Sequence, residues 1–371
     1  MTNVSEVFTN IYFLLFFCIV FPLLLSIRLY PVIIYLAHQK KLMDEPEERS
    51  MHSIKTPTLG GIGIFISFSL AIILMGVFVD LEKNNLIQIL SLLGGVIILL
   101  FLGIKDDLLV LSPKKKIIGQ FFSALLVILG TDNRITDFYG IFGIGELPYM
   151  VSVVFTLMVF IFLINAFNLI DGIDGLAASV AVIANTSFGV YFMMNGETLY
   201  VLICFILIGA LLGFLRYNLS PSKKLFMGDS GSLFIGFLLS FLAIAFLNTN
   251  SMEETTYTVS NAPIMVLAIL AYPILDAVRV IIIRLGKGVS PFTADRSHIH
   301  HRLLDSGYSH VKATLVVAIC NIFVIQIAFI LSDLYLNVQL FIISIVLPLL
   351  CLLPFLIVKK QGRYTIHIPR F

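Results

Sequence analysis

The chain is a succession of long apolar runs separated by short polar linkers. A membrane-spanning helix needs about 20 mostly apolar residues, and eleven runs meet that need. Because these runs are too uniformly apolar to show one wet face, they predict helices surrounded by lipid or by each other. The predicted spans are about 11–36, 59–79, 86–104, 116–131, 149–166, 176–193, 198–215, 231–247, 261–284, 311–331 and 338–358.

Lysine and arginine divide the linkers into two groups. One group holds only Lys83 and Arg134, whereas nearly all other basic residues lie in or next to the second group. Since basic residues mark cytoplasmic linkers, the second group is predicted to be cytoplasmic, with the N-terminus outside and the C-terminus inside. The odd number of spans agrees with that orientation. The predicted cytoplasmic linkers are 37–58, 105–115, 167–175, 216–230, 285–310 and the tail 359–371.

Composition supports the same fold class. Of the 371 residues, 59% are hydrophobic and 12% are charged, whereas soluble domains carry about 25% charged residues. The four cysteines lie inside apolar runs and form no CxxC pair, so neither a disulfide framework nor a thiolate metal site is expected. A net charge of +2 gives no reason to expect a nucleic-acid partner. With no cleavable signal or soluble segment apparent, we predict one all-α polytopic membrane domain over residues 1–371.

The polar stretch NAFNLIDGIDGL follows the fifth predicted span. It contains Asn165, Asn168, Asp171 and Asp174, and a glycine directly follows each aspartate. Glycine permits turns that other residues resist, so the carboxylates are predicted on a bent or broken helix end. Their spacing of three would place both on one face if the turn stayed helical. Such oxygens at a membrane-level helix end suit a hard cation such as Mg²⁺, and a simple polar helix cap is the alternative.

Two further predicted cytoplasmic linkers carry aspartates. Asp106 and Asp107 are adjacent at a membrane boundary, where keeping both ionised is costly, so the pair suits a base or a phosphate-positioning group. A solvated loop is the alternative. Asp229 lies between Gly228 and a serine just before the eighth predicted span, where it suits a cation ligand, a helix cap or both.

Basic and glycine-bearing segments on the same side are candidates for binding phosphate. Lys116 follows two other lysines at the start of the fourth predicted span, a natural position for a lipid phosphate. Gly60 and Gly61 follow a basic linker, and paired glycines let backbone N–H groups approach a phosphate. A positive-inside linker with a glycine helix start explains the glycines equally well.

The longest predicted cytoplasmic linker carries a dense basic cluster within SPFTADRSHIHHRLL. Arginine forks and imidazoles suit a pyrophosphate that gains charge during transfer. Zinc is the rival ligand, but the histidines lack a thiolate and the HExxH spacing. In the preceding span Asp276 and Arg279 are three apart, and a mutual pair would explain both. The candidate residues of the cluster are Arg296, His298, His300 and His301.

Together these linkers offer acidic groups for a metal, cationic groups for phosphate and access to the bilayer. We therefore expect Mg²⁺-assisted phosphoryl transfer from a soluble donor to a lipid acceptor at the cytoplasmic surface. A transporter is the alternative from another class. Transporter sites lie near the bilayer midplane, often with an internal repeat, whereas these motifs cluster at one face and no repeat is visible.

Four motifs in this order resemble those of the polyprenyl-phosphate N-acetylhexosamine-1-phosphate transferases, the WecA/MraY-like superfamily also called glycosyltransferase family 4. They are the aspartate pair, NAFNLIDGIDGL, FMGDSGS and DRSHIHHRLL, and the similarity runs from the first predicted cytoplasmic linker to at least Leu304. The resemblance implies transfer of a sugar 1-phosphate from a UDP-activated amino sugar to undecaprenyl phosphate. UMP is released, the cofactor is Mg²⁺ or Mn²⁺, and the enzyme lies in the bacterial inner membrane, where a homodimer is possible.

The resemblance also implies residue roles, motif by motif. By resemblance, Asp229 is the principal Mg²⁺ ligand with Asn168 as the second, and Asp171 and Asp174 belong to the uridine-diphosphate and metal site. Asp106 and Asp107 would activate or position the lipid phosphate, and Lys116 would contact a phosphate. The donor's diphosphate or sugar would be held by Arg296, His298, His300 and His301. The aspartate pair continues as DDLLV, so the third charged partner frequent in the family cannot be assigned. HIHH with its preceding DR resembles the WecA-type branch, which favours a UDP-GlcNAc-like donor over UDP-muramoyl-pentapeptide, the runner-up.

Overall fold

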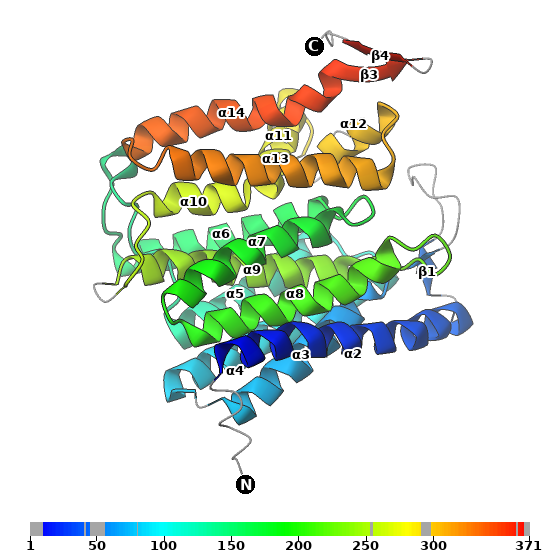
Figure 1. Ribbon diagram of the computed structural model, residues 1–371, viewed down its shortest axis with the longest axis horizontal. Coiled ribbons are helices and arrows are strands. Elements are labelled where there is room, and N and C mark those ends of the chain that lie inside the picture. Colours follow the sequence, from blue (N-terminus) through cyan, green and yellow to red (C-terminus); the bar gives the residue numbers. More distant parts are fainter. Residues whose placement is uncertain are drawn as a thin grey trace.

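The computed structural model describes residues 10–40, 42–44, 56–79, 81–252, 255–290, 298–360 and 363–366, with side chains up to residue 350. Helices dominate this part of the chain (Figure 1). Each predicted span corresponds to one helix, except that the ninth corresponds to two. The helices are α2 (Ile11–Lys40), α3 (Gly60–Phe78), α4 (Lys83–Leu109), α5 (Pro113–Thr131), α6 (Tyr149–Leu169), α7 (Leu176–Met194), α8 (Thr198–Asn218), α9 (Asp229–Asn250), α10 (Ala262–Ile269), α11 (Ala271–Gly286), α12 (Ile299–Asp305), α13 (His310–Ile330) and α14 (Leu336–Leu356), with the short 3-10 helix η1 (Ile141–Gly143).

The helices confirm a predominantly helical, multi-pass membrane protein. Among the described residues, eight helices are long and apolar enough to cross a membrane, and the bent pair α10 and α11 would make a ninth if it counts as one span. Helix α5 does not meet that criterion, and α14 is apolar over Leu336–Leu350, the part whose side chains are described. The count of eleven and the orientation across the membrane therefore stay predictions.

Two short antiparallel hairpins were not predicted. β1 (Met43–Asp44) pairs with β2 (Thr56–Pro57), and β3 (Ile357–Lys360) pairs with β4 (Arg363–Ile366). Strands this short show no useful alternation of polar and apolar residues. The β3–β4 hairpin begins where the eleventh predicted span was expected to end.

Helix α9 is the centre of the bundle. Its apolar segment is entirely buried, and it packs against α3, α4, α6, α7 and α10. Figure 1 shows α2, α3 and α4 on one side of α9 and α10, α13 and α14 on the other. Because lipid gives apolar helices little hydrophobic reason to associate, close backbone packing has to stabilise such a bundle.

Small residues bring three helices together at the start of α9. A Cβ on Gly61 of α3 would lie 2.1 Å from the backbone nitrogen of Gly231, and one on Gly103 of α4 would lie 2.4 Å from that of Ser230. Any larger side chain at Gly61 or Gly103 would force these helices apart. The N-terminus of α9 is therefore packed tightly between α3 and α4.

The ninth predicted span is broken, with α10 and α11 bent by 77° at Leu270. Pro273 lacks an N–H and its ring conflicts with a helical carbonyl at Ile269. Asn321 of α13 occupies the break: its Nδ2 donates to the carbonyl of Ile269 at 3.1 Å, and its Oδ1 accepts from the N–H of Tyr272 at 3.1 Å. One buried amide thus satisfies both backbone groups that the break frees.

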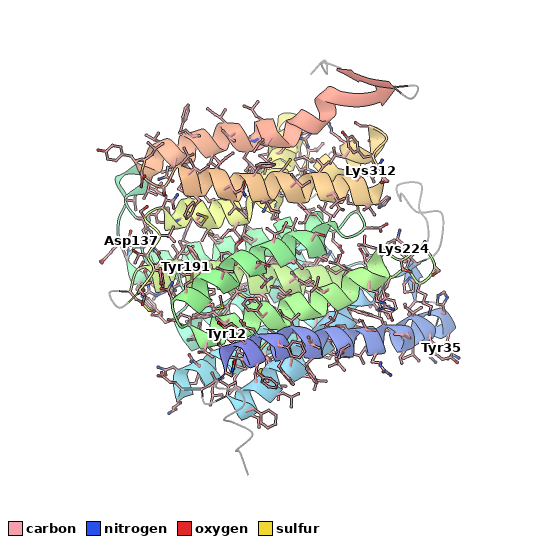
Figure 2. All side chains as sticks on the ribbon, in the orientation of Figure 1. Tyr12, Tyr35, Asp137, Tyr191, Lys224 and Lys312 are labelled. Atoms are coloured by element: carbon pink, nitrogen blue, oxygen red, sulfur yellow. The ribbon has the colours of Figure 1, made fainter. Side chains whose placement is uncertain are left out.

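The two groups of linkers lie at opposite ends of the bundle. Figure 2 places Tyr35, Lys224 and Lys312 at one end and Asp137 and Tyr191 at the other. β1, α12 and the β3–β4 hairpin lie at the end that carries Lys224 (Figure 1). The division that lysine and arginine predicted is therefore reproduced in space.

Candidate active site

The N-terminus of α9 carries the acidic centre of the site. Gly228 precedes the helix with φ 72° and ψ 173°, a conformation that glycine tolerates. Asp229 is the first helical residue, so α9 begins two residues before the predicted span. Both carboxylate oxygens of Asp107 accept from this turn, Oδ1 from the N–H of Asp229 at 2.8 Å and Oδ2 from that of Ser230 at 3.2 Å. Asp107 therefore caps α9 and positions Asp229.

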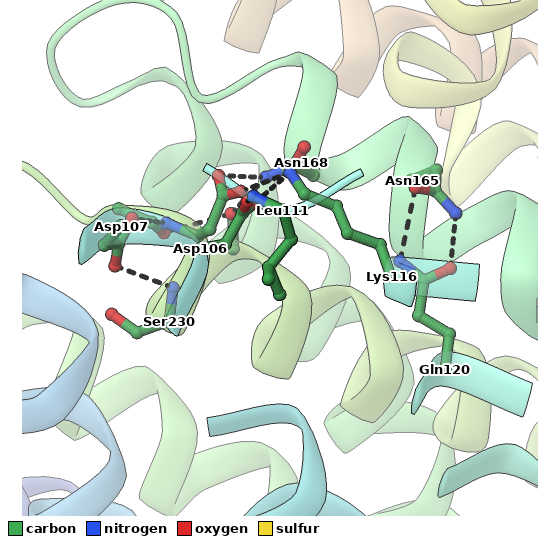
Figure 3. A network of polar contacts seen from close by, with 11 residues as sticks. Asp106, Asp107, Leu111, Lys116, Gln120, Asn165, Asn168 and Ser230 are labelled. Carbon is green, nitrogen blue, oxygen red and sulfur yellow. Dashed lines mark hydrogen bonds and ion pairs between the residues drawn. The ribbon is translucent and has the colours of Figure 1, made fainter. Parts of the chain in front are cut away.

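Asp106 points to a different partner from its neighbour. Helix α4 extends to Leu109, beyond the predicted end at residue 104, so both aspartates are helical and diverge. Lys116 Nζ forms an ion pair with Oδ2 of Asp106 and another with Oδ2 of Asp229 at 2.7 Å. Figure 3 shows Asp106 and Asp107 of α4 lying close to Lys116 of α5 and Asn168 of α6. Asp107 thus caps α9, whereas Asp106 shares the Lys116 ammonium with Asp229.

Asn168 completes this group from the end of α6. Its Nδ2 donates to Oδ1 of Asp229 and to Oγ of Ser232, both at 2.8 Å. A metal ligand would need Oδ1 in that place, which a half-turn of the amide supplies, and the two orientations are nearly indistinguishable by shape. Within the described residues no three His, Cys, Asp or Glu side chains form a metal cluster. Two carboxylates and an amide nevertheless match Mg²⁺, which binds through few protein ligands plus water and substrate phosphates.

Asp171 and Asp174 lie on a broken helix end, as predicted, so the helical face that their spacing would otherwise give is not formed. The segment between α6 and α7 is a series of turns ending at Gly175, whose φ is 77°. Burial together with the charges of Asp229, Asp107 and Asp174 raises the pKa of the partly buried Asp171 carboxyl well above its ordinary value. Asp171 therefore faces the acidic centre.

Asp174 turns to a second, basic group. Its Oδ2 lies 2.7 Å from Lys224 Nζ and 3.3 Å from His310 Nδ1, while its buried Oδ1 has no hydrogen-bond partner in the part of the chain that the structure describes. Lys224 also lies 5.4 Å from the ring centroid of Phe226. The turn between α6 and α7 thus sends one aspartate to each of two adjoining groups.

The prediction that Gly60 and Gly61 offer N–H groups to a phosphate is wrong. The N–H of Gly60 donates to the carbonyl of Phe226 at 2.9 Å, and that of Gly61 donates to the carbonyl of Met227 at 2.8 Å. Phe226 in turn donates to the carbonyl of Pro57 at 2.8 Å. These bonds attach the start of α3 to the segment before α9, so both glycines serve close packing.

The histidine cluster meets the carboxylate turn at Gly172. His300 is fully buried, and a Cβ on Gly172 would lie 2.3 Å from its Nε2. Burial lowers the pKa of His300 to about 3, so it is neutral, contrary to the predicted cationic cluster. His301 lies 4.4 Å from His300 between ring centroids. Arg296 lies outside the described residues.

Three contributors were missed or misassigned from the sequence. Asp276 lies 2.8 Å from His298 Nδ1, a partner not considered from the sequence, where only Arg279 was named. Asn218 accepts from the N–H of Gly175 at 2.5 Å and donates to the carbonyl of Leu225 at 2.9 Å. Lys224 was counted only as an orientation signal. Asp276 had one usable signal, because polar residues at membrane depth are functional by default, whereas Asn218 lay in a predicted linker and had none.

Comparison with known proteins identifies the family. The glycosyl transferase family 4 profile matches residues 89–247. A probable undecaprenyl-phosphate N-acetylglucosaminyl 1-phosphate transferase of Bacillus subtilis is 31% identical over 323 residues, which cover 85% of each chain. This chain belongs to glycosyl transferase family 4. The family predicted from the four motifs is thereby confirmed, and the protein is a transferase.

Two further relatives carry related names. A decaprenyl-phosphate N-acetylglucosaminephosphotransferase of Mycolicibacterium smegmatis is 32% identical over 291 residues, 73% of this chain and 71% of that one. An undecaprenyl-phosphate alpha-N-acetylglucosaminyl 1-phosphate transferase of Escherichia coli K12 is 30% identical over 286 residues, 75% of this chain and 73% of that one. The profile match in this family 4 transferase runs from α4 to α9 and so includes Asp106, Asp107, Asn168 and Asp229.

Proposed function

We propose that this transferase moves N-acetylglucosamine 1-phosphate from UDP-N-acetylglucosamine to undecaprenyl phosphate and releases UMP. The product, an undecaprenyl-diphosphate sugar, would start a cell-surface glycan. The proposal rests above all on one observation: Asp106, Asp107, Lys116, Asn168 and Asp229, from four helices, meet at the end of the bundle that carries the basic linkers. A soluble donor and the head group of a membrane lipid can both reach that end.

The reaction needs one bond made and one broken. An oxygen of the lipid phosphate attacks the sugar-bearing phosphorus of the donor, the bond from that phosphorus to the bridging oxygen breaks, and UMP leaves with the bridging oxygen. Because the acceptor is already a phosphate anion, positioning and charge neutralisation suffice, and no covalent enzyme intermediate is required. Lys116, which already bridges two carboxylates, is suited to receive a phosphate oxygen.

Mg²⁺ is proposed as the cofactor, with Mn²⁺ as a substitute. Asp229 and Asn168 would hold it, since they converge on one point and Asp107 fixes the backbone of Asp229. When bound, the cation neutralises phosphate charge that grows during transfer. The charge of Asp229 raises the pKa of Asp171, so a cation bound at Asp229 would favour the ionised form of Asp171.

N-acetylglucosamine is the preferred donor sugar on two grounds. The three relatives described above are all named for N-acetylglucosamine. The HIHH motif with its preceding DR also resembles the branch that uses small UDP-sugars. These grounds disfavour a UDP-muramoyl-pentapeptide donor.

A donor panel tests the proposal. The purified protein would be incubated with undecaprenyl phosphate, Mg²⁺ and either UDP-N-acetylglucosamine, UDP-N-acetylgalactosamine, UDP-glucose or UDP-muramoyl-pentapeptide, and UMP would be measured. We expect UMP with UDP-N-acetylglucosamine only when both lipid and Mg²⁺ are present. UMP from the muramoyl donor alone would reassign the substrate, and UMP without lipid would contradict the acceptor.

A further inference from the structure

Helix α11 carries a carboxylate that the proposed reaction does not use. Asp276 is fully buried, and both its oxygens are occupied. Oδ2 lies 2.8 Å from Nδ1 of His298, and Oδ1 accepts from the N–H of Ile299 at 2.8 Å. These bonds join the second half of the broken ninth span to the first turn of α12, which lies 22 residues further along the chain.

The contact determines which nitrogen of His298 carries the proton. A carboxylate accepts a hydrogen bond, so Nδ1 must be the donor, and in the neutral ring Nε2 then presents its lone pair. Nε2 of His298 has no hydrogen-bond partner among the described residues. The hydrogen bond to Asp276 therefore fixes the imidazole of His298 through Nδ1 and leaves Nε2 able to bind another group.

The held ring supports the histidines that reach the acidic turn. His298 stacks on His300 with ring centroids 5.5 Å apart and planes 18° apart, and His300 packs directly on Gly172. A continuous line of contacts thus runs from Asp276 through His298 and His300 to the turn that carries Asp171.

We propose that Asp276 is a positioning residue of the transferase: it fixes the orientation and tautomer of His298, so that Nε2 can accept a hydrogen bond from the UDP-sugar or, once protonated, donate one to its diphosphate. This inference rests on the proposed function. It assigns Asp276 an effect on the donor that is exerted entirely through His298. Carboxylates behind metal-binding imidazoles act in this way, and their loss costs about 10–100-fold; we expect an effect of similar size here.

The alternative is that Asp276 only ties α12 to α11. Asp276→Asn separates the two roles because the amide oxygen can still accept from Ile299, whereas its NH₂ group would face Nδ1 of His298. The ring could then keep its hydrogen bond only by moving its proton to Nε2. Asp305→Asn is the matched control, since Asp305 is an exposed aspartate at the end of α12.

Kinetics on five proteins test the effect: wild type, Asp276→Asn, His298→Ala, the double variant and the control Asp305→Asn. We expect Asp276→Asn to lower kcat/KM for UDP-N-acetylglucosamine by about 10–100-fold with the KM for undecaprenyl phosphate unchanged. In the His298→Ala background it should have no further effect, and Asp305→Asn should match wild type. The proposal is overturned if Asp276→Asn costs the same factor with and without His298, or if the KM for the lipid changes instead.

The tautomer can be measured without turnover. In protein labelled with [¹⁵N]histidine, the His298 resonances, assigned by their loss in His298→Ala, should show a protonated Nδ1 in wild type and a protonated Nε2 in Asp276→Asn. A protonated Nε2 in neutral wild-type His298, or the same tautomer in both proteins, overturns the assignment. If no UDP-sugar is turned over, the proposed function fails, while this measurement still decides how Asp276 acts on His298.

Discussion

His300 should make the protein sensitive to mild acid. Its folded-state pKa is about 3 because it is buried, whereas an unfolded histidine titrates near pH 6.5. As the pH falls below about 6.5, His300 binds a proton in the unfolded state but stays neutral in the folded state, so stability is lost progressively down to about pH 3. Between pH 7 and pH 5 the difference amounts to about 2 kcal/mol.

The perturbation is His300→Gln, which removes the titrating ring and keeps a polar side chain. Thermal unfolding of purified wild type and variant would be followed at pH 7 and pH 5. We expect the wild type to lose about 2–3 °C more than the variant over this interval, since an unfolding entropy of about 2.1 cal/mol/K per residue makes 1 kcal/mol worth about 1.3 °C in a chain of 371 residues. His38→Gln, which removes an exposed imidazole at the end of α2, should behave like wild type. Equal losses in wild type and His300→Gln would refute a buried, neutral His300.

Three other variants separate chemistry from architecture. Asp106→Asn should reduce turnover about 10²–10⁴-fold at unchanged thermal stability. Asp107→Asn should also lower the melting temperature, because its amide NH₂ would face an N–H of α9. Equal melting temperatures for Asp107→Asn and wild type would contradict the capping role of Asp107. Asn321→Leu should destabilise the protein by leaving two buried backbone groups unsatisfied at about 1–3 kcal/mol each, while Gln326→Leu on the same helix should not; equal melting curves would contradict the role of Asn321 at the break.

Much of the fold follows from one-dimensional patterns. Each apolar run predicts a helix, and the uneven distribution of lysine and arginine predicts which linkers share an end. The convergence of Asp106, Asn168, Asp171 and Asp229 follows from the same grouping, because all four lie at predicted cytoplasmic ends.

The remaining features depend on contacts between distant segments. The apolar run 261–284 gives no sign that Asn321, about 50 residues later, will satisfy a break before Pro273. Gly60 and Gly61 fit a phosphate loop and a helix crossing equally well until Phe226 and Met227 are placed beside them. Burial is likewise invisible in a short motif, which is why the neutral state of His300 was not predicted.

The end of α4 shows a related limit. Asp106 and Asp107 were expected in a loop because charged residues end an apolar run. Hydrogen bonding keeps the helix intact through both, with the N–H of Val110 still donating to the carbonyl of Asp106 at 3.0 Å. Hydropathy marks where an apolar run ends, and here the helix continues past that point.

The central claim is that the carboxylates gathered around Asp229 form one Mg²⁺-dependent phosphoryl-transfer site. The most direct measurement uses UDP-N-acetylglucosamine labelled with ³²P at the sugar-bearing phosphate, and follows label into the lipid extract of wild type and Asp229→Asn as Mg²⁺ is titrated. We predict that wild type incorporates label in step with UMP release and only with Mg²⁺, and that Asp229→Asn incorporates about 10²–10⁴-fold less. Label reaching the lipid at equal rates in both proteins, or in wild type without a divalent cation, would contradict the account.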